Sequence, residues 1–117
     1  MISASTHREL RAWQESMKLV EMLYRDTTGF PKVELFGLTT QMRRAAVSIP
    51  SNIAEGSARN SPGELGHFLG IACGSLAELE TQIEISKRLG FLPAASDIFS
   101  QLSRVGQLLI ALRRSVK

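Results

Sequence analysis

The sequence has little of what disulfide-stabilised and metal-binding proteins need: its 117 residues include one cysteine, Cys73, and two histidines, His7 and His67. One cysteine cannot form an internal disulfide, and the histidines are too isolated for a local zinc motif. Long apolar runs are also missing, and charges begin close to the N-terminus, so we expect neither a signal peptide nor a membrane helix. These absences predict a cytoplasmic protein with no metal, no cofactor and no membrane contact.

The short motifs of common enzymes are missing as well. The sequence has no phosphate-binding loop, nucleophile elbow or dinucleotide-binding fingerprint. Glu78, Glu80 and Glu84 bring carboxylates together, but the Glu-x-x-His pairs of di-iron bundles are absent, so ion pairs on a helix surface are the simpler interpretation. Cys73 has no obvious activating base. We predict that the protein is not an enzyme and assign it no catalytic residue.

The apolar residues that are present recur with helical spacing in four blocks, and no sustained alternation predicts a strand. In chain order the blocks run from about His7 to Gly29, Val33 to just before Gly56, Ser61 to Gly90, and Pro93 or Ala94 to the C-terminus. Steps averaging about 3.5 residues keep one seam of each helix facing its neighbours, and short connections make successive helices antiparallel. We predict one all-α domain, residues 7–117, folded as an antiparallel up-down-up-down four-helix bundle.

The second block contains a proline in its middle, Pro50. Proline removes a backbone donor and clashes with the carbonyl four residues earlier, at a cost of about 3 kcal/mol inside a helix. Because the apolar spacing continues across it to Ile53, we predict a kinked but continuous helix. Ser48 and Ser51 can then bond loosened carbonyls, and Asn52 can bridge to a neighbouring helix.

Asn52 and Glu55 share a helical face beside this proline. If that face is buried, the Glu55 carboxylate needs a partner, and Arg59, four residues on, is the nearest candidate. In our leading hypothesis, Pro50, Asn52 and Glu55 form and support the kink. The alternative is an enzyme or small-ligand-binding protein that uses Asn52 and Glu55, which predicts an accessible pocket and a perturbed carboxylate.

The apolar faces are wider than one small bundle can bury, which favours self-association. The residues that widen them are Leu19, Leu23, Phe68, Ile71, Phe99, Leu108 and Ile110. Glycines also repeat every four residues in the third block, at Gly66, Gly70 and Gly74. Since each costs about 1 kcal/mol relative to Ala in a helix, we expect another helix to approach this smooth face closely.

Positive charge exceeds negative charge by three and is concentrated in two segments. Residues 32–60 carry a net charge of +2 and residues 93–117 a net charge of +3, which permits contact with phosphate groups. The candidate nucleic-acid-binding residues are Arg43, Arg44, Arg59, Arg104, Arg113 and Arg114. The alternative interpretation is a solvated face, ion pairs between subunits, or basic residues that complement a helix dipole.

Two long segments resemble the family of 23S rRNA intervening-sequence proteins: RRAAVSIPSNIAEGSAR at residues 43–59 and FLGIACGSLAELETQIEISKRLGFL at residues 68–92. The resemblance implies a four-helix bundle that assembles with its own copies, as a pentameric ring in members of the family. It also implies similarity to accessory proteins of diversity-generating retroelements, which act with a reverse transcriptase and bind nucleic acid through basic surfaces. We therefore expect a homopentameric scaffold or adaptor, with RNA, DNA and a protein as candidate partners.

Overall fold

The protein is built from helices, as the computed structural model shows for residues 4–116, with side chains described from His7 onward. The α-helices are α1 (Arg11–Thr27), α2 (Thr40–Ala58), α3 (Pro62–Arg88) and α4 (Ile98–Ser115). Short helical turns precede α1 and α2, namely η1 (Ala4–Glu9), η2 (Lys32–Glu34) and η3 (Leu35–Thr39). The described residues contain no strand, and the all-α prediction is confirmed.

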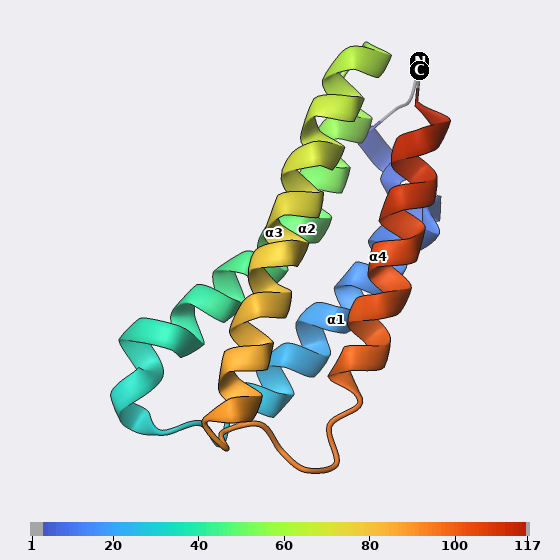
Figure 1. The fold of residues 1–117 in the computed structure, drawn as a ribbon. Coiled ribbons are helices and arrows are strands. Elements are labelled where there is room, and N and C mark those ends of the chain that lie inside the picture. Colours follow the sequence, from blue (N-terminus) through green and yellow to red (C-terminus); the bar gives the residue numbers. More distant parts are fainter. Residues whose placement is uncertain (1–3, 117) are drawn as a thin grey trace.

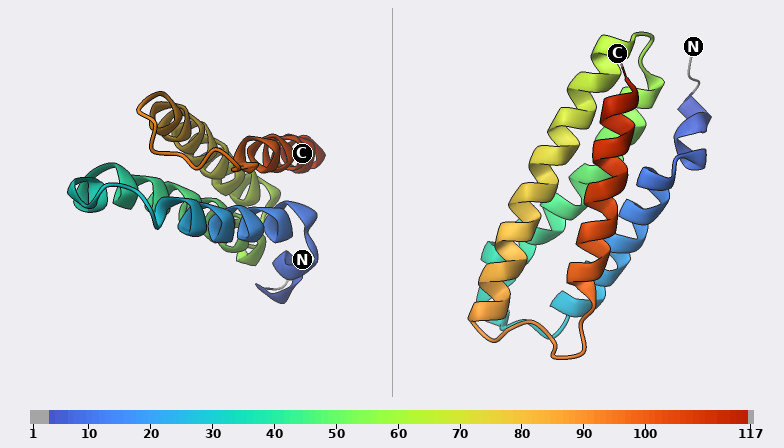
Figure 2. Two further views of the ribbon diagram at one scale, coloured as in Figure 1. Left: turned by 90° about the horizontal axis from the view of Figure 1, so that it is seen from below. Right: turned by 45° about the vertical axis from the view of Figure 1, so that its right-hand side comes forward.

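The helices lie in two layers, one formed by α1 and α2 and the other by α3 and α4 (Figure 2, left). α3 packs more extensively against α2 than against any other helix, and α4 lies beside α1 (Figure 1). η1 and the last turn of α4 lie toward the same end of the molecule (Figures 1 and 2). The bundle measures 45 × 25 × 20 Å, and the start of α2 projects beyond the helices around it.

The longest helix, α3, begins and ends at the residues that the sequence marks. The Ser61 hydroxyl accepts a hydrogen bond from the backbone N–H of Glu64 (3.1 Å), and Pro62 is the first helical residue. At the other end, Gly90 has a positive φ of 78°. The N–H groups of Gly90 and Phe91 bond back to carbonyls of the last turn, the closing pattern that a left-handed glycine allows.

α2 begins as a regular helix at Thr40 instead of near Val33, where the sequence places its start. The reason is Gly37, whose backbone angles are not helical (φ −119°, ψ −110°), so that the chain before it forms only short turns. Once started, α2 runs as one α-helix across the buried Pro50 to Ala58.

α4 begins at Ile98 instead of near Pro93. The residues before it form a loop that is held against α1 by side-chain hydrogen bonds. The Ser96 hydroxyl donates to the Asp26 carboxylate (2.5 Å) and accepts from the backbone N–H of Ile98 (3.2 Å). This contact between distant segments sets the helix start and has no local sequence signal.

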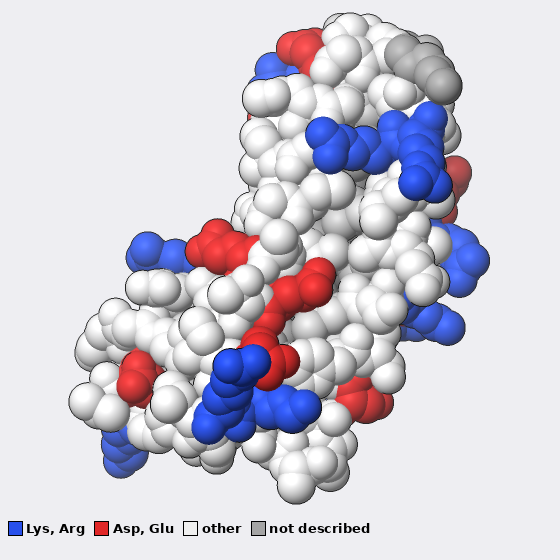
Figure 3. Space-filling model, viewed as in Figure 1, with Lys and Arg blue, Asp and Glu red and all other residues white. Residues whose placement is uncertain are grey.

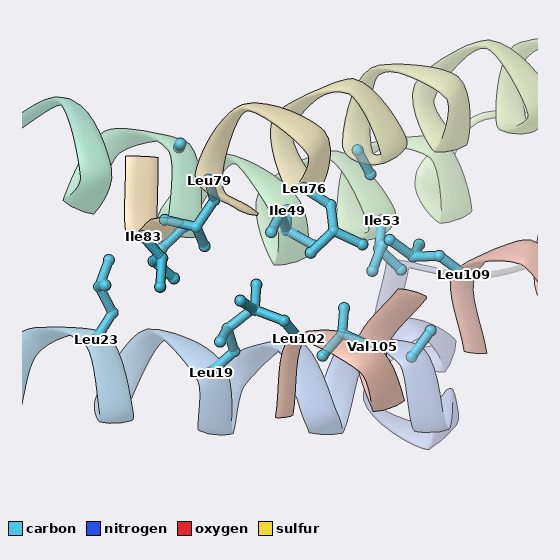
Figure 4. Close-up of a cluster of buried hydrophobic side chains, with 14 of the residues drawn as sticks. Leu19, Leu23, Ile49, Ile53, Leu76, Leu79, Ile83, Leu102, Val105 and Leu109 are labelled. Atoms are coloured by element: carbon cyan, nitrogen blue, oxygen red, sulfur yellow. The ribbon is translucent and has the colours of Figure 1, made fainter. Parts of the chain in front are cut away.

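Side chains from all four α-helices meet in one hydrophobic core (Figure 4). Leu19, Ile49, Leu79 and Val105, one from each helix, are completely buried. The sequence places Leu19 and Leu23 among the residues that widen the apolar face, but this is wrong for both. They point into the core toward side chains of α3 and α4, and neither is exposed.

Candidate functional site

Next to Pro50, polar side chains link α2 to α3. The Asn52 amide donates to the Ser48 carbonyl (2.7 Å) and to the Ser48 hydroxyl (2.9 Å), one turn earlier in α2. The Ser48 hydroxyl lies 2.8 Å from the hydroxyl of Ser75 on α3. Asn52 therefore reaches α3 through Ser48 and does not bridge to it directly. All three side chains are partly buried, so these bonds satisfy groups that water reaches poorly.

Glu55 lies on the exposed side of α2. Its carboxylate accepts a hydrogen bond from Arg59 (2.7 Å), the partner that the sequence predicts. The Arg59 guanidinium also lies 3.9 Å from the Glu64 carboxylate and 5.0 Å from the ring centre of Phe68. Arg59 thus connects the end of α2 with the start of α3. Because water screens exposed pairs, these contacts fix local geometry more than they add stability.

A surface groove of about 850 Å³ lies between α3 and α4. Its lining includes Ile85 from α3, and Phe99 and Ile110 from α4, all of them exposed. No residue of α2 lines it, so it is not the pocket that the catalytic alternative predicts beside Asn52 and Glu55.

Three of the six candidate arginines are engaged by side chains of the same molecule: Arg43, Arg59 and Arg104. Arg43 donates to the Thr27 hydroxyl (3.0 Å) and stacks on Tyr24, 4.6 Å from the ring centre. Arg104 lies 3.4 Å from the Glu15 carboxylate. These contacts support the interpretation of these arginines as structural residues.

Glu15 is the centre of a polar contact between α1 and α4. It is buried and accepts hydrogen bonds from Gln101 (3.0 Å), Lys18 (3.2 Å) and Arg104 (3.4 Å). The hydrogen bond from Gln101 does most to lower the pKa of Glu15, and that from Lys18 follows. Together these donors outweigh the effect of burial and bring the pKa to about 2, so Glu15 is a carboxylate at neutral pH.

The other three candidates are exposed and form no ion pair among the described residues: Arg44, Arg113 and Arg114. Arg44 lies near the start of α2, which is beside the end of α3, because Met42 contacts Ser86 (3.3 Å). Arg113 lies over the beginning of α3, 3.1 Å from the place that a Cβ atom at Gly70 would take. The structure therefore separates Arg44 from the two C-terminal arginines.

The family model described as 23S rRNA-intervening sequence protein matches residues 8–111. The chain belongs to this family. The match covers α1, α2 and α3 completely and α4 as far as Ala111, which confirms over nearly the whole chain a resemblance first stated from two segments. A search of curated proteins gives no match.

This 23S rRNA-intervening sequence family protein has two further exposed arginines near the start of α1, Arg8 and Arg11. Arg8 belongs to η1, which lies toward the same end of the molecule as the last turn of α4, where Arg113 and Arg114 are (Figure 1), and Arg11 is the first residue of α1. We call these four residues the terminal arginine cluster. All four are exposed, Glu9 lies in the same segment, and none of the four forms an ion pair within residues 7–116. On the face drawn in Figure 3, basic side chains lie across this end.

Other residue types with reactive or ligand-binding side chains have packing partners here. In the described part of the chain, no three His, Cys, Asp or Glu side chains come together as a metal site would require. Cys73 packs against the core, and the His67 ring lies 5.3 Å from that of Phe68. None of the helices within residues 4–116 is both long and apolar enough to cross a membrane.

Proposed function

We propose that the protein is a non-enzymatic, cytoplasmic scaffold or adaptor that assembles with its own copies, as a pentamer, and binds RNA or DNA through repeated arginines. The observation that carries this proposal is a set of large apolar side chains that the helices, and the short turns next to them, leave exposed. They are Met17, Tyr24, Val33, Leu35, Phe36, Val47, Ile71, Ile85, Leu89, Phe99 and Ile110.

Several of these side chains lie in groups, whereas the exposed apolar residues of ordinary protein surfaces are scattered. Val33 and Phe36 lie on the segment that precedes α2, and they are 86% and 93% exposed. Ile85, Phe99 and Ile110 lie together along the groove between α3 and α4. Exposed apolar groups of this kind mark interaction surfaces, and contact between copies would remove both from water.

The proposed subunit is the antiparallel up-down-up-down bundle, with α2 kinked at Pro50. The order of contacts between α2 and α3 supports opposite directions, because Ser48 meets Ser75 whereas Gly56, further along α2, meets the earlier Leu65. A proline inside a helix removes one backbone hydrogen bond and bends the helix, which supports the kink.

The terminal arginine cluster is the proposed nucleic-acid contact. Among the described residues, none of its guanidinium groups forms an ion pair with a carboxylate. Their N–H groups can therefore donate hydrogen bonds to phosphate oxygens. One cluster is a weak site. Five copies on one assembly bind much more tightly, because each bound cluster raises the effective concentration of the others.

Salt-dependent binding to RNA and DNA tests this proposal. Replacing Arg113 and Arg114 by Ala is expected to weaken binding and to reduce the slope of log K against log salt by about two for each engaged subunit. The matched control, Lys18→Ala with Arg59→Ala, removes the same charge from residues that pair with Glu15 and Glu55, and is expected to keep the slope. Undetectable wild-type binding at low salt would contradict the nucleic-acid role.

The catalytic alternative is tested by Glu55→Gln. Glu55 pairs with Arg59 on an exposed face, so we expect the substitution to leave helix content and assembly mass unchanged and to lower stability slightly. Loss of a chemical activity or of a bound small molecule, with stability unchanged, would instead support a catalytic or ligand-binding role for this residue.

A further inference from the structure

An apolar projection stands out from the α1–α2 layer. It consists of Val33, Leu35 and Phe36, which we call the knob. These residues lie in η2 and η3, immediately before α2, and their side chains are 86%, 45% and 93% exposed. Their segment is helical and contacts chiefly the start of α2, where the ribbon extends past the other helices (Figures 1 and 2). Fixing the backbone of this segment in a helical turn costs conformational entropy. An exposed phenylalanine there does not offset that cost by burying apolar surface within the subunit.

The groove between α3 and α4 is an apolar hollow in the other layer. Ile85, Phe99 and Ile110 expose their side chains along it, and Gly106 keeps the α4 wall low. Its volume, about 850 Å³, is far larger than one aromatic side chain, so it can take a turn of helix with several apolar residues. Figure 3 shows this face, with acidic and basic side chains along the groove's α3 side.

The molecule cannot fill its own groove with its own knob. The knob belongs to the layer of α1 and α2, whereas the groove lies between the helices of the other layer (Figure 2, left). We propose that the knob of one copy inserts into the α3–α4 groove of a second copy. This inference rests on the proposed self-association and names the two surfaces that produce it.

Charges beside the two surfaces are complementary. Lys32 precedes the knob and Glu34 lies between Val33 and Leu35, so the segment carries one charge of each sign. The groove is lined by Glu80 and Glu84, which can receive Lys32, and by Arg88, which can receive Glu34. Within one copy, Arg88 and Glu84 form a surface ion pair at 3.1 Å. Lys32 and Glu34 of the second copy would add to this pair. Such charges fix the orientation of a contact more than they strengthen it.

Two different surfaces in one contact give a head-to-tail arrangement. Each copy uses its knob toward one neighbour and its groove toward the other, which closes into a ring when the rotation between copies divides a full turn. A symmetrical dimer, by contrast, would use the same surface twice. The inference therefore supplies a geometry that is compatible with the proposed pentamer.

Two variants, each defective in one surface, test the pairing. Phe36→Asp removes the knob, and Ile110→Lys places a charge in the groove; both residues are exposed, so the bundle itself does not depend on them. Ala111→Lys, at an exposed position of α4 outside the groove, is the matched control. We expect each defective variant to be a helical monomer by sedimentation and the control to assemble. Phe36→Ala, which adds no charge, should weaken association about tenfold or more.

Mixing the two defective variants gives the decisive result. The intact knob of Ile110→Lys can enter the intact groove of Phe36→Asp, so the mixture should form a 1:1 dimer and stop there. Two variants that do not pair, or a Phe36→Asp variant that still assembles like the wild type, would overturn the knob-in-groove contact while leaving self-association intact. A wild-type protein that stays monomeric at all concentrations would instead overturn the proposed function, and this inference with it.

Discussion

Gly56 lies where α2 packs tightly against α3, and Gly56→Ala tests that contact. A Cβ atom at this position would lie 2.9 Å from the Phe68 Cβ atom, 3.1 Å from the Leu65 Cδ1 atom and 3.3 Å from the Leu65 carbonyl oxygen. Two of these neighbours are fixed to the α3 backbone, so they cannot move aside unless the helices separate. At Gly74, in contrast, an added Cβ meets no atom within 4 Å.

The same substitution therefore has opposite signs at the two positions. Replacing glycine by alanine inside a helix stabilises it by about 1 kcal/mol, and this gain applies to both. Overpacking costs about 1 to 3 kcal/mol and applies only at Gly56. We expect Gly74→Ala to raise the free energy of unfolding by about 1 kcal/mol and Gly56→Ala to lower it by about 1 kcal/mol. Gly70→Ala should also be tolerated, since its neighbour is the movable end of Arg113.

Urea unfolding followed by circular dichroism measures these differences. The stability of an oligomer depends on concentration, so the variants are compared at equal concentrations. In thermal unfolding, 1 kcal/mol corresponds to about 3 to 5 °C for a chain of this length. If Gly56→Ala were as stable as Gly74→Ala, the close approach of α2 and α3 at Gly56 would be refuted.

Three further predictions concern the contacts between helices. Glu15→Gln should make stability depend less on pH in acid. The pKa of Glu15 falls from 4.5 to about 2 on folding, so the carboxylate's contribution to the free energy of unfolding is complete above about pH 4.5 and is lost as the pH falls toward 2. Urea unfolding at several pH values measures this difference. Ser48→Ala and Ser75→Ala should each cost about 1 kcal/mol in urea unfolding and be less than additive together, because both remove the same hydrogen bond. Leu79→Ala should cost about 2 to 5 kcal/mol, since the side chain is completely buried; a loss below 1 kcal/mol would contradict its place in the core.

Helix ends were predictable from the sequence where the residue that starts or stops the helix acts on its near neighbours in the chain. Ser61 caps α3 and Gly90 closes it, because each acts within a few residues of the sequence. The starts of α2 and α4 were misplaced, since Gly37 adopts a non-helical conformation and Ser96 bonds to Asp26 seventy residues away in the chain. Neither event leaves a periodic pattern.

The glycines show the same limit. Their spacing predicted a smooth face at Gly66, Gly70 and Gly74. Among the residues that the structure describes, however, no atom lies within 4 Å of a Cβ atom placed at Gly74, and at Gly70 the neighbour is the Arg113 side chain. The close crossing of α2 and α3 is instead at Gly56, which has no glycine repeat around it. The positions of glycines in the sequence show where a second helix could pack closely. Where it does so depends on the path of that helix, which the sequence pattern does not give.

The arginines could be chosen from the sequence, but their roles could not. Arg59 was matched with Glu55 from a spacing of four residues within one helical face, whereas the contact of Arg104 with Glu15 spans α1 and α4. Arg8 and Arg11 were not selected, because only the fold brings η1 and the last turn of α4 toward the same end of the molecule.

The mass of the wild-type particle in solution tests the central claim, self-association through exposed apolar surfaces, most directly. Sedimentation equilibrium from low to high micromolar concentration is expected to give a closed particle of five times the 12.9 kDa chain mass, with no larger species. A mass of one chain at every concentration would contradict the account.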